Sequence, residues 1–121
     1  MIKEKSRNFN VFAYGSLTDQ QFVERLIGRV IEMVPARLKG YKRLKLHNKE
    51  YPLAIKDPQS TIRGKLLLNL SSQDLEKIEK WEETPEEIYK EIKVSVETDE
   101  GKKEAFVYVG NEENITKVNE E

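Results

Sequence analysis

The chain has 121 residues, 37% hydrophobic and 36% charged, and its 21 basic and 22 acidic residues nearly cancel. This length suits one domain with one core, and the balance gives no global basic field to attract nucleic acid. The absence of cysteine and the single histidine, His47, exclude a disulfide framework and a histidine-rich zinc site. No apolar stretch is as long as a transmembrane helix, and the N-terminus lacks the apolar core of a signal peptide. We therefore expect one cytoplasmic domain over residues 1–121, with an ordered core at about 9–110 and no metal, membrane or nucleic-acid partner.

The first predicted element is a strand at residues 9–14, with apolar side chains on both faces. We expect this strand to be central and buried. Gly15 breaks it, and Thr18 followed by Gln21 forms a capping-box pattern that predicts the start of a helix. Gly28 is expected to end this helix.

The middle of the chain predicts several short strands separated by turn residues. The strand candidates are residues 30–34, 36–38, 43–46, 53–55 and 62–68, and the turn signals are Pro35, Gly40, Asn48, Pro52, Asp57-Pro58 and Gly64. A second helix is predicted from Ser71, with Asp74 completing a capping box, to about Glu83.

The last predicted elements form a hairpin, because residues 92–96 alternate in polarity, 99–101 make a turn, and 105–109 return. Many short strands with two main helices, and without regular βαβ alternation, indicate the α+β class. We expect a small, mostly antiparallel β-barrel or curled mixed sheet with two main flanking helices.

One carboxylate of the second helix lies where an apolar residue is expected. Glu82 is seven residues after Leu75 and four after Ile78, on the apolar stripe that these two define. A carboxyl group that faces a partly dry cavity tends to have a raised pKa, which suits general acid–base chemistry. The alternatives are that the helix ends before Glu82, or that Glu82 meets an internal Arg or Lys.

A second candidate site is the junction Tyr14-Gly15-Ser16-Leu17, where a buried strand turns into a helix. Free backbone N–H groups and the positive end of a helix dipole can bind an anion or a developing oxyanion there, although most such junctions bind nothing. Ser16 lacks the G-x-S-x-G context of a hydrolase nucleophile. The basic run at residues 41–45 is interpreted as a solvated strand face, because acids dominate elsewhere.

Seven segments, in the same order, resemble motifs of the γ-glutamylcyclotransferase-like superfamily, also called AIG2-like. The first resembles that superfamily's opening "VYG(S/T)L", and the resemblance covers about residues 10–110. The segments are Phe12–Leu17, Ala36–Tyr41, Tyr51–Ala54, Ile62–Leu66, Leu70–Glu82, Tyr89–Val96 and Ala105–Val109.

The resemblance implies a small barrel flanked by helices that needs no metal or cofactor. It implies that Glu82 is the catalytic acid–base and that Tyr14, Gly15, Ser16 and Leu17 hold the γ-glutamyl group.

Tyr89, like Tyr14, is expected to form a pocket wall with a hydrogen-bonding tip. The chain departs from the family pattern around these residues, with Glu79 in place of Asp, Glu83 in place of Gly, and Lys90-Glu91 in place of Arg. These departures leave the acid–base in place and bear on which substrate is accepted.

The implied function is the release of 5-oxoproline and an amine from a small γ-glutamyl amine or peptide. The alternative is a non-catalytic module of the same fold that binds a small metabolite or a protein. An RNA-binding barrel is disfavoured by the charge balance and by the lack of an interleaved basic–aromatic stripe.

Overall fold

The computed structural model describes residues 9–45, 52–82 and 89–110. The predicted tails, His47, Asn48, Tyr51, Glu83 and the predicted helix stop at Pro85 lie outside these residues. The elements are β1 (Phe9–Ala13), the 3-10 turn η2 (Ser16–Thr18), α1 (Gln20–Ile27), β2 (Glu32–Lys45), β3 (Pro52–Leu70), α2 (Ser72–Glu82), β4 (Tyr89–Thr98) and β5 (Gly101–Gly110).

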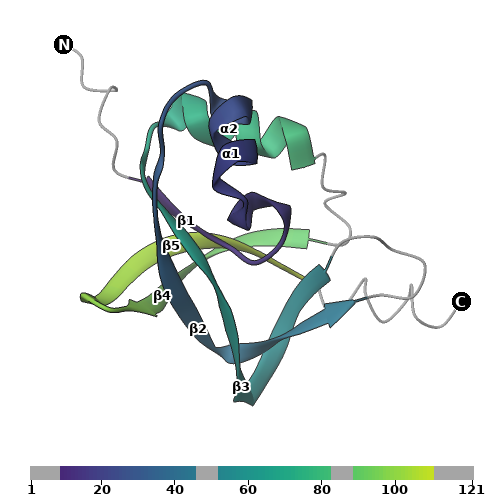
Figure 1. Cartoon of the computed structure of the whole chain (residues 1–121). Helices are drawn as coiled ribbons and strands as arrows, with labels where there is room; N and C mark the ends of the chain where they lie inside the picture. The colour runs from purple at the N-terminus through teal and green to yellow at the C-terminus, as the bar shows by residue number, and fades with distance from the viewer. Residues whose placement is uncertain (1–8, 46–51, 83–88, 111–121) are drawn as a thin grey trace, which may run out of the picture.

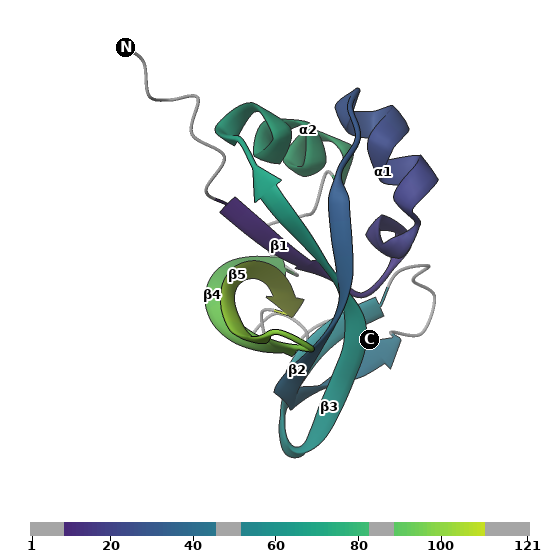
Figure 2. The same ribbon diagram turned by 60° about the vertical axis from the view of Figure 1, so that its left-hand side comes forward.

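The strands form a closed barrel in the order β1-β3-β2-β4-β5. Neighbouring strands run antiparallel except for β1 and β5, which run parallel, with Val11 opposite Phe106. Both helices lie on one side of the barrel, beside β1 (Figures 1 and 2). The predicted α+β class, with a mostly antiparallel barrel and two main flanking helices, is confirmed.

The prediction of short, separate strands in the middle of the chain is wrong. β2 continues through Pro35 and Gly40, and β3 continues through Gly64. The register of the two strands shifts at Gly40, whose φ is 88°, because residues 57–60 of β3 lie between the partners of Lys39 and Tyr41. Pro35 is tolerated because, among the described strands, only β3 pairs with β2 at this position, so no second strand needs a backbone N–H from it.

A Cβ on Gly64 would lie 2.1 Å from the carbonyl oxygen of Ala13 on β1, so Gly64 marks a close approach and not a strand end. At the predicted turn Asp57-Pro58 the pairing is interrupted, and the Gln59 amide and the Ser60 hydroxyl donate to Asp57.

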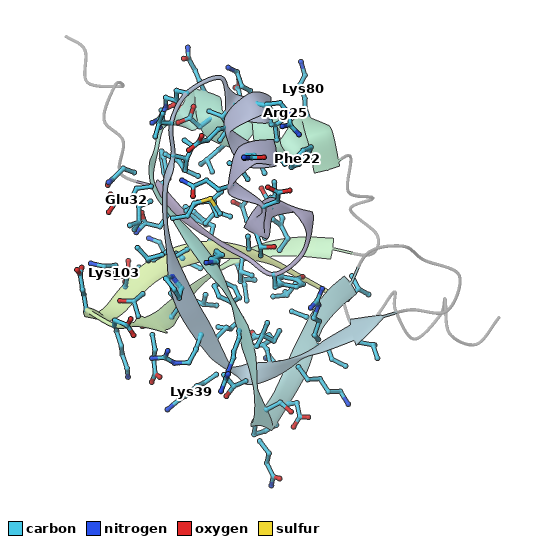
Figure 3. The ribbon with its side chains drawn as sticks, in the orientation of Figure 1. Phe22, Arg25, Glu32, Lys39, Lys80 and Lys103 are labelled. Atoms are coloured by element: carbon cyan, nitrogen blue, oxygen red, sulfur yellow. The ribbon has the colours of Figure 1, made fainter. Side chains whose placement is uncertain are left out.

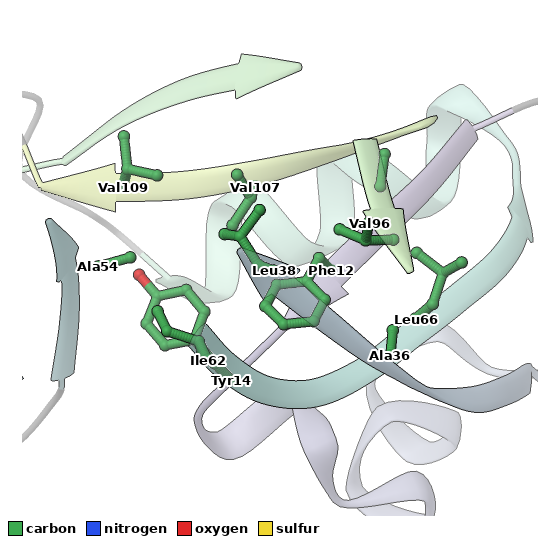
Figure 4. Close-up of a cluster of buried hydrophobic side chains, with 11 residues drawn as sticks. Phe12, Tyr14, Ala36, Leu38, Ala54, Ile62, Leu66, Val96, Val107 and Val109 are labelled. Carbon is green, nitrogen blue, oxygen red and sulfur yellow. The ribbon is translucent and has the colours of Figure 1, made fainter. Parts of the chain in front are cut away.

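The apolar side chains form two clusters, which β1 separates. The barrel core lies inside the barrel (Figure 4) and consists of Phe12, Tyr14, Ala36, Leu38, Ala54, Ile62, Leu66, Val96, Ala105, Val107 and Val109. The helix-side core lies between the barrel and the helices and consists of Val11, Ala13, Leu17, Val23, Ile27, Ile31, Leu67, Leu70 and Ile78. The prediction that the first strand is buried on both faces is therefore confirmed.

Helix α1 begins one residue later than the capping pattern predicted. The side chain of Asp19 accepts hydrogen bonds from the amides of Gln21 and Phe22, so Asp19 is the N-cap and the proposed capping box of Thr18 and Gln21 is wrong. Asp19 is the N-cap because its charged oxygen accepts stronger hydrogen bonds than the hydroxyl of Thr18 would. The predicted end at Gly28 is confirmed, since Gly28 is the C-cap in the left-handed conformation at φ 95°.

Helix α2 begins as predicted. The amide of Ser71 donates to Asp74 at 2.9 Å, and the amide of Asp74 donates to the Ser71 hydroxyl at 3.1 Å. These reciprocal bonds satisfy two amides that the helix itself leaves without partners. The predicted hairpin of β4 and β5 is also confirmed, with Thr98 opposite Gly101.

Candidate functional site

The loop that follows β1 is closed by a short turn. The amide and the hydroxyl of Thr18 both donate to the carbonyl oxygen of Gly15, at 2.9 and 2.7 Å. The amides of Ser16 and Leu17 precede this bond and have no acceptor within the turn. The carboxylate of Asp19 already accepts from the amides of Gln21 and Phe22, so the first turn of α1 is capped by its own chain. The sequence had predicted that Ser16 and Leu17 lead directly into the helix.

Tyr14 belongs to the barrel core. Its side chain is 9% exposed, its ring stacks on Phe12 at a centroid distance of 6.3 Å, and its hydroxyl donates to the carbonyl oxygen of Tyr108 on β5. These contacts fasten the end of β1 to the neighbouring strand. The predicted role of Tyr14 in substrate binding stays a prediction.

Tyr89 and the Gly15 loop lie at the same end of the barrel. Tyr89 is opposite Gly110 on β5, and β5 runs parallel to β1 from the pair Val11 and Phe106. Residues of two parallel strands stay in register along the chain, so Gly15 and Gly110, each four residues after this pair, lie at the same height of the barrel. The side chains of Tyr89 and Ser16 are outside the part that the structure describes, so their predicted contacts stay predictions.

The backbone of α2 extends through Glu82, so the alternative in which the helix ends earlier is wrong. Ile78, one helical turn before Glu82, is fully buried in the helix-side core, as is Leu17 of the Gly15 loop at 5% exposure. Ile78 and Leu17 thus belong to one apolar cluster, which the barrel and both helices share. The position of the Glu82 carboxyl group lies outside the described side chains.

A polar clamp that the sequence analysis did not single out fixes α2 against α1. A guanidinium nitrogen of Arg29 lies 2.5 Å from the buried carboxylate of Asp74 and donates to the carbonyl oxygen of Asn69 at 3.1 Å. Lys77 donates to the carbonyl oxygen of Ile27 at 2.8 Å, at the C-terminal end of α1, where the helix dipole favours a cation. The sequence did indicate that Asp74 caps α2, and a buried carboxylate needs a cation beside it, so this pattern could have predicted a nearby Arg or Lys.

The electrostatics of Asp74 follow from these contacts. Burial acts to raise the pKa of Asp74, but the Ser71 amide and the Arg29 guanidinium stabilise the carboxylate more, and the pKa is lowered from its ordinary value. The clamp is therefore an ionised pair at neutral pH, and it fixes the orientation of the helix that carries Glu82.

Within the described residues, no group of three or more His, Cys, Asp or Glu side chains could hold a metal ion. Nor is any described helix both long enough and apolar enough to span a bilayer. The described residues thus provide a tight turn after β1 and a second helix that is held by charged contacts at Asp74 and Lys77.

Comparison with known proteins gives a family match over almost the whole chain. The family described as gamma-glutamyl cyclotransferase, AIG2-like, matches residues 11–121. AIG2-like protein B of Arabidopsis thaliana is 33% identical over 87 residues, which are 72% of this chain and 49% of that protein. A Methanocaldococcus jannaschii protein is 30% identical over 107 residues, which are 88% of this chain and 48% of that protein. It is named gamma-glutamylcyclotransferase, and the name adds a candidate RNase.

A solved structure titled gamma-glutamyl cyclotransferase has the same fold. It superposes with a TM-score of 0.69 over 84% of this chain and 65% of that chain, at 20% sequence identity. The chain spans about half the length of AIG2-like protein B and of the Methanocaldococcus jannaschii protein.

Proposed function

The chain belongs to the gamma-glutamyl cyclotransferase, AIG2-like, family, and we propose that it releases 5-oxoproline and an amine from a small γ-glutamyl amine or peptide. The observation that carries this proposal is the extent of the match. It covers residues 11–121 and so includes the Gly15 loop, Glu82 and Tyr89 together.

The proposed reaction is an intramolecular acyl transfer. The α-amine of the γ-glutamyl group attacks its own γ-carbonyl carbon, a five-membered ring closes, and the bond to the leaving amine breaks. Because both reacting groups belong to one molecule, the enzyme mainly has to hold the substrate folded, and such positioning can supply about 7–11 kcal/mol of the barrier.

In this proposal Glu82 transfers the protons. Its carboxylate takes one from the α-ammonium, which makes the amine nucleophilic, and gives it to the departing amine. The second proton that the nitrogen loses as the lactam forms is transferred in the same way, so the amine leaves as an ammonium ion. Support comes from the backbone: the helix reaches Glu82, and Ile78 is buried in the same cluster as Leu17.

The amides of Ser16 and Leu17 would stabilise the negative charge of the tetrahedral intermediate. Removing one such donor from an enzyme typically costs about 10²–10³-fold in rate. The two bonds from Thr18 to the Gly15 carbonyl support this role, because they hold the turn in one conformation before substrate arrives. Tyr89, at the same barrel end, would form part of the pocket wall.

A mass-spectrometric assay of 5-oxoproline release from a panel of γ-glutamyl amino acids, peptides and amines tests the proposal. We expect release by the wild type and a loss of about 10²-fold or more in Glu82→Gln. Glu76→Gln is the matched control, since Glu76 is an exposed carboxylate on the same helix.

Equal loss in Glu76→Gln and Glu82→Gln would contradict a specific role for Glu82. Folded protein that releases nothing from any member of the panel would instead favour the alternative, a metabolite-binding or protein-binding module of this fold.

A further inference from the structure

The near-neutral total charge hides an uneven distribution. Residues 32–70, which include β2 and β3, carry nine Lys and Arg and three Asp and Glu, whereas the rest of the chain carries twelve and nineteen. Overall neutrality, from which we expected no nucleic-acid partner, therefore says little about this part of the surface. A strongly basic segment in a neutral protein is typical of binding to a polyanion.

The barrel places three of these cations in one row with a charged residue of β4 and one of β5. Arg63 of β3 is opposite Arg37 of β2, Arg37 is opposite Glu97 of β4, and Glu97 is opposite Lys102 of β5. Lys39 lies two residues after Arg37 on the same face and adds a fourth cation. We call Arg37, Lys39, Arg63 and Lys102 the basic row.

The basic row lies on the outer surface of the barrel. Ala36, Leu38 and Ile62 alternate with it along the strands and are buried in the barrel core, so the row faces outward. The side chain of Lys39 is 67% exposed, and Arg63 and Lys102 are exposed. Figure 3 shows Lys39 at the end of the molecule opposite Arg25 and Lys80 of the helices.

Glu97 forms salt bridges with two of the four cations. Glu97 lies 3.1 Å from Lys39 and 3.8 Å from Arg37. The hydrogen bond from Lys39, opposed by a smaller desolvation effect, lowers the pKa of Glu97 from its ordinary value. Neither Arg63 nor Lys102 has a salt bridge within the described part of the chain.

Two arginines directly opposite each other on an exposed face repel, and the fold alone gives no reason to place them there. A bound anion between them would convert this repulsion into attraction. The four cations lie on three strands: Arg63 is on β3, Arg37 and Lys39 are on β2, and Lys102 is on β5 beyond Glu97 of β4. Neighbouring strands are about 4.8 Å apart, so the cations form a line and not an enclosed pocket. Such a line suits a chain of successive negative charges better than one small anion, since each contact releases a condensed counterion from a polyanion.

We propose that the basic row binds the phosphodiester backbone of a nucleic acid, without regard to base sequence. The surface uses none of the residues assigned to the cyclotransferase reaction, so it stands whether or not that reaction is found. Backbone contacts of this kind give dissociation constants of about 10⁻⁴–10⁻⁶ M at physiological salt.

Fluorescence anisotropy with labelled oligothymidylate and oligouridylate, over a range of salt concentrations, tests the proposal. Four phosphate contacts to a single strand predict a slope of log K against log salt of about −2.8. In Arg63→Gln/Lys102→Gln the slope should fall to about −1.4, with about 25-fold weaker binding at 0.1 M salt. Glu97→Gln should bind more tightly, because Arg37 and Lys39 lose their competing carboxylate.

Arg25→Gln/Lys80→Gln is the matched control, because it removes the same charge from exposed positions on the helices. It should bind like the wild type. Equal losses in the two double variants would overturn the proposal in favour of net charge, and folded wild-type protein that does not bind at low salt would also overturn it. Displacement of the oligonucleotide by polyglutamate at equal charge concentration would assign the surface to an acidic polypeptide instead.

Discussion

Replacing Asp74 by alanine is expected to loosen the attachment of α2 without disturbing the barrel core. Asp74 is 5% exposed, accepts the Ser71 amide at 2.9 Å, and lies 2.5 Å from the guanidinium of Arg29. Alanine removes both bonds and leaves the half-buried Arg29 without its carboxylate.

The magnitude follows from these two contacts. Losing a capping side chain costs about 1 kcal/mol, and losing a hydrogen bond to a charged group costs about 1.5–3 kcal/mol. A total of about 3 kcal/mol is therefore expected, which for a domain of this size lowers the melting temperature by about 10–15 °C.

Urea denaturation at several pH values measures the effect, with Glu76→Ala as the control on an exposed position of the same helix. The folded-state pKa of Asp74 is lowered, so its ionisation stabilises the protein above its unfolded pKa, and this contribution is lost as the pH falls through the folded pKa. The difference between wild type and Asp74→Ala should thus be constant near neutrality and shrink below about pH 4.

A loss in Asp74→Ala no larger than that in Glu76→Ala would refute the clamp. So would a difference that stays unchanged down to the lowest pH at which the wild type is folded, because the ionised pair would then contribute nothing.

Two further substitutions test the barrel. Gly64→Ala should cost about 3 kcal/mol or prevent folding, since its Cβ would lie 2.1 Å from the Ala13 carbonyl oxygen; a melting temperature within a few degrees of wild type would contradict the close approach. Tyr14→Phe should cost about 1 kcal/mol in urea denaturation, because the Tyr108 carbonyl oxygen loses its hydroxyl donor. An unchanged stability would show that this bond does not hold β1 to β5.

Sequence patterns predicted the start of a helix correctly where no neighbouring residue could make a stronger N-cap than the predicted one. Ser71 and Asp74 form the reciprocal cap that their spacing indicated. The same pattern failed at Thr18 because Asp19, one residue later, makes the stronger cap. A spacing rule does not rank two neighbouring caps.

The long strands were predicted as fragments because Pro35, Gly40 and Gly64 are turn signals when read locally. Only tertiary structure explains them: the Ala13 carbonyl lies against Gly64, and within the described residues Pro35 pairs with β3 alone. Barrel closure by the pair Val11 and Phe106 is likewise a tertiary contact, which no local pattern encodes.

For the candidate site, the helical spacing from Ile78 to Glu82 was the useful signal, and the helix does reach Glu82. The burial of Leu17 and Ile78 in one cluster and the clamp through Arg29 depend on how the two helices pack, which sequence spacing leaves open.

The parallel pairing of β1 with β5 has a consequence for synthesis of the protein. Phe106 must leave the ribosome before Val11 can gain its second neighbouring strand, and at about 5–20 residues per second that takes roughly 5 to 20 s. During this time one edge of β1 has no neighbouring strand. Exposed strand edges of this kind make folding intermediates prone to aggregation, and chaperones bind such intermediates. The rate-limiting step of folding should therefore be the arrival of the C-terminal hairpin at β1, because contacts so distant in sequence form slowly.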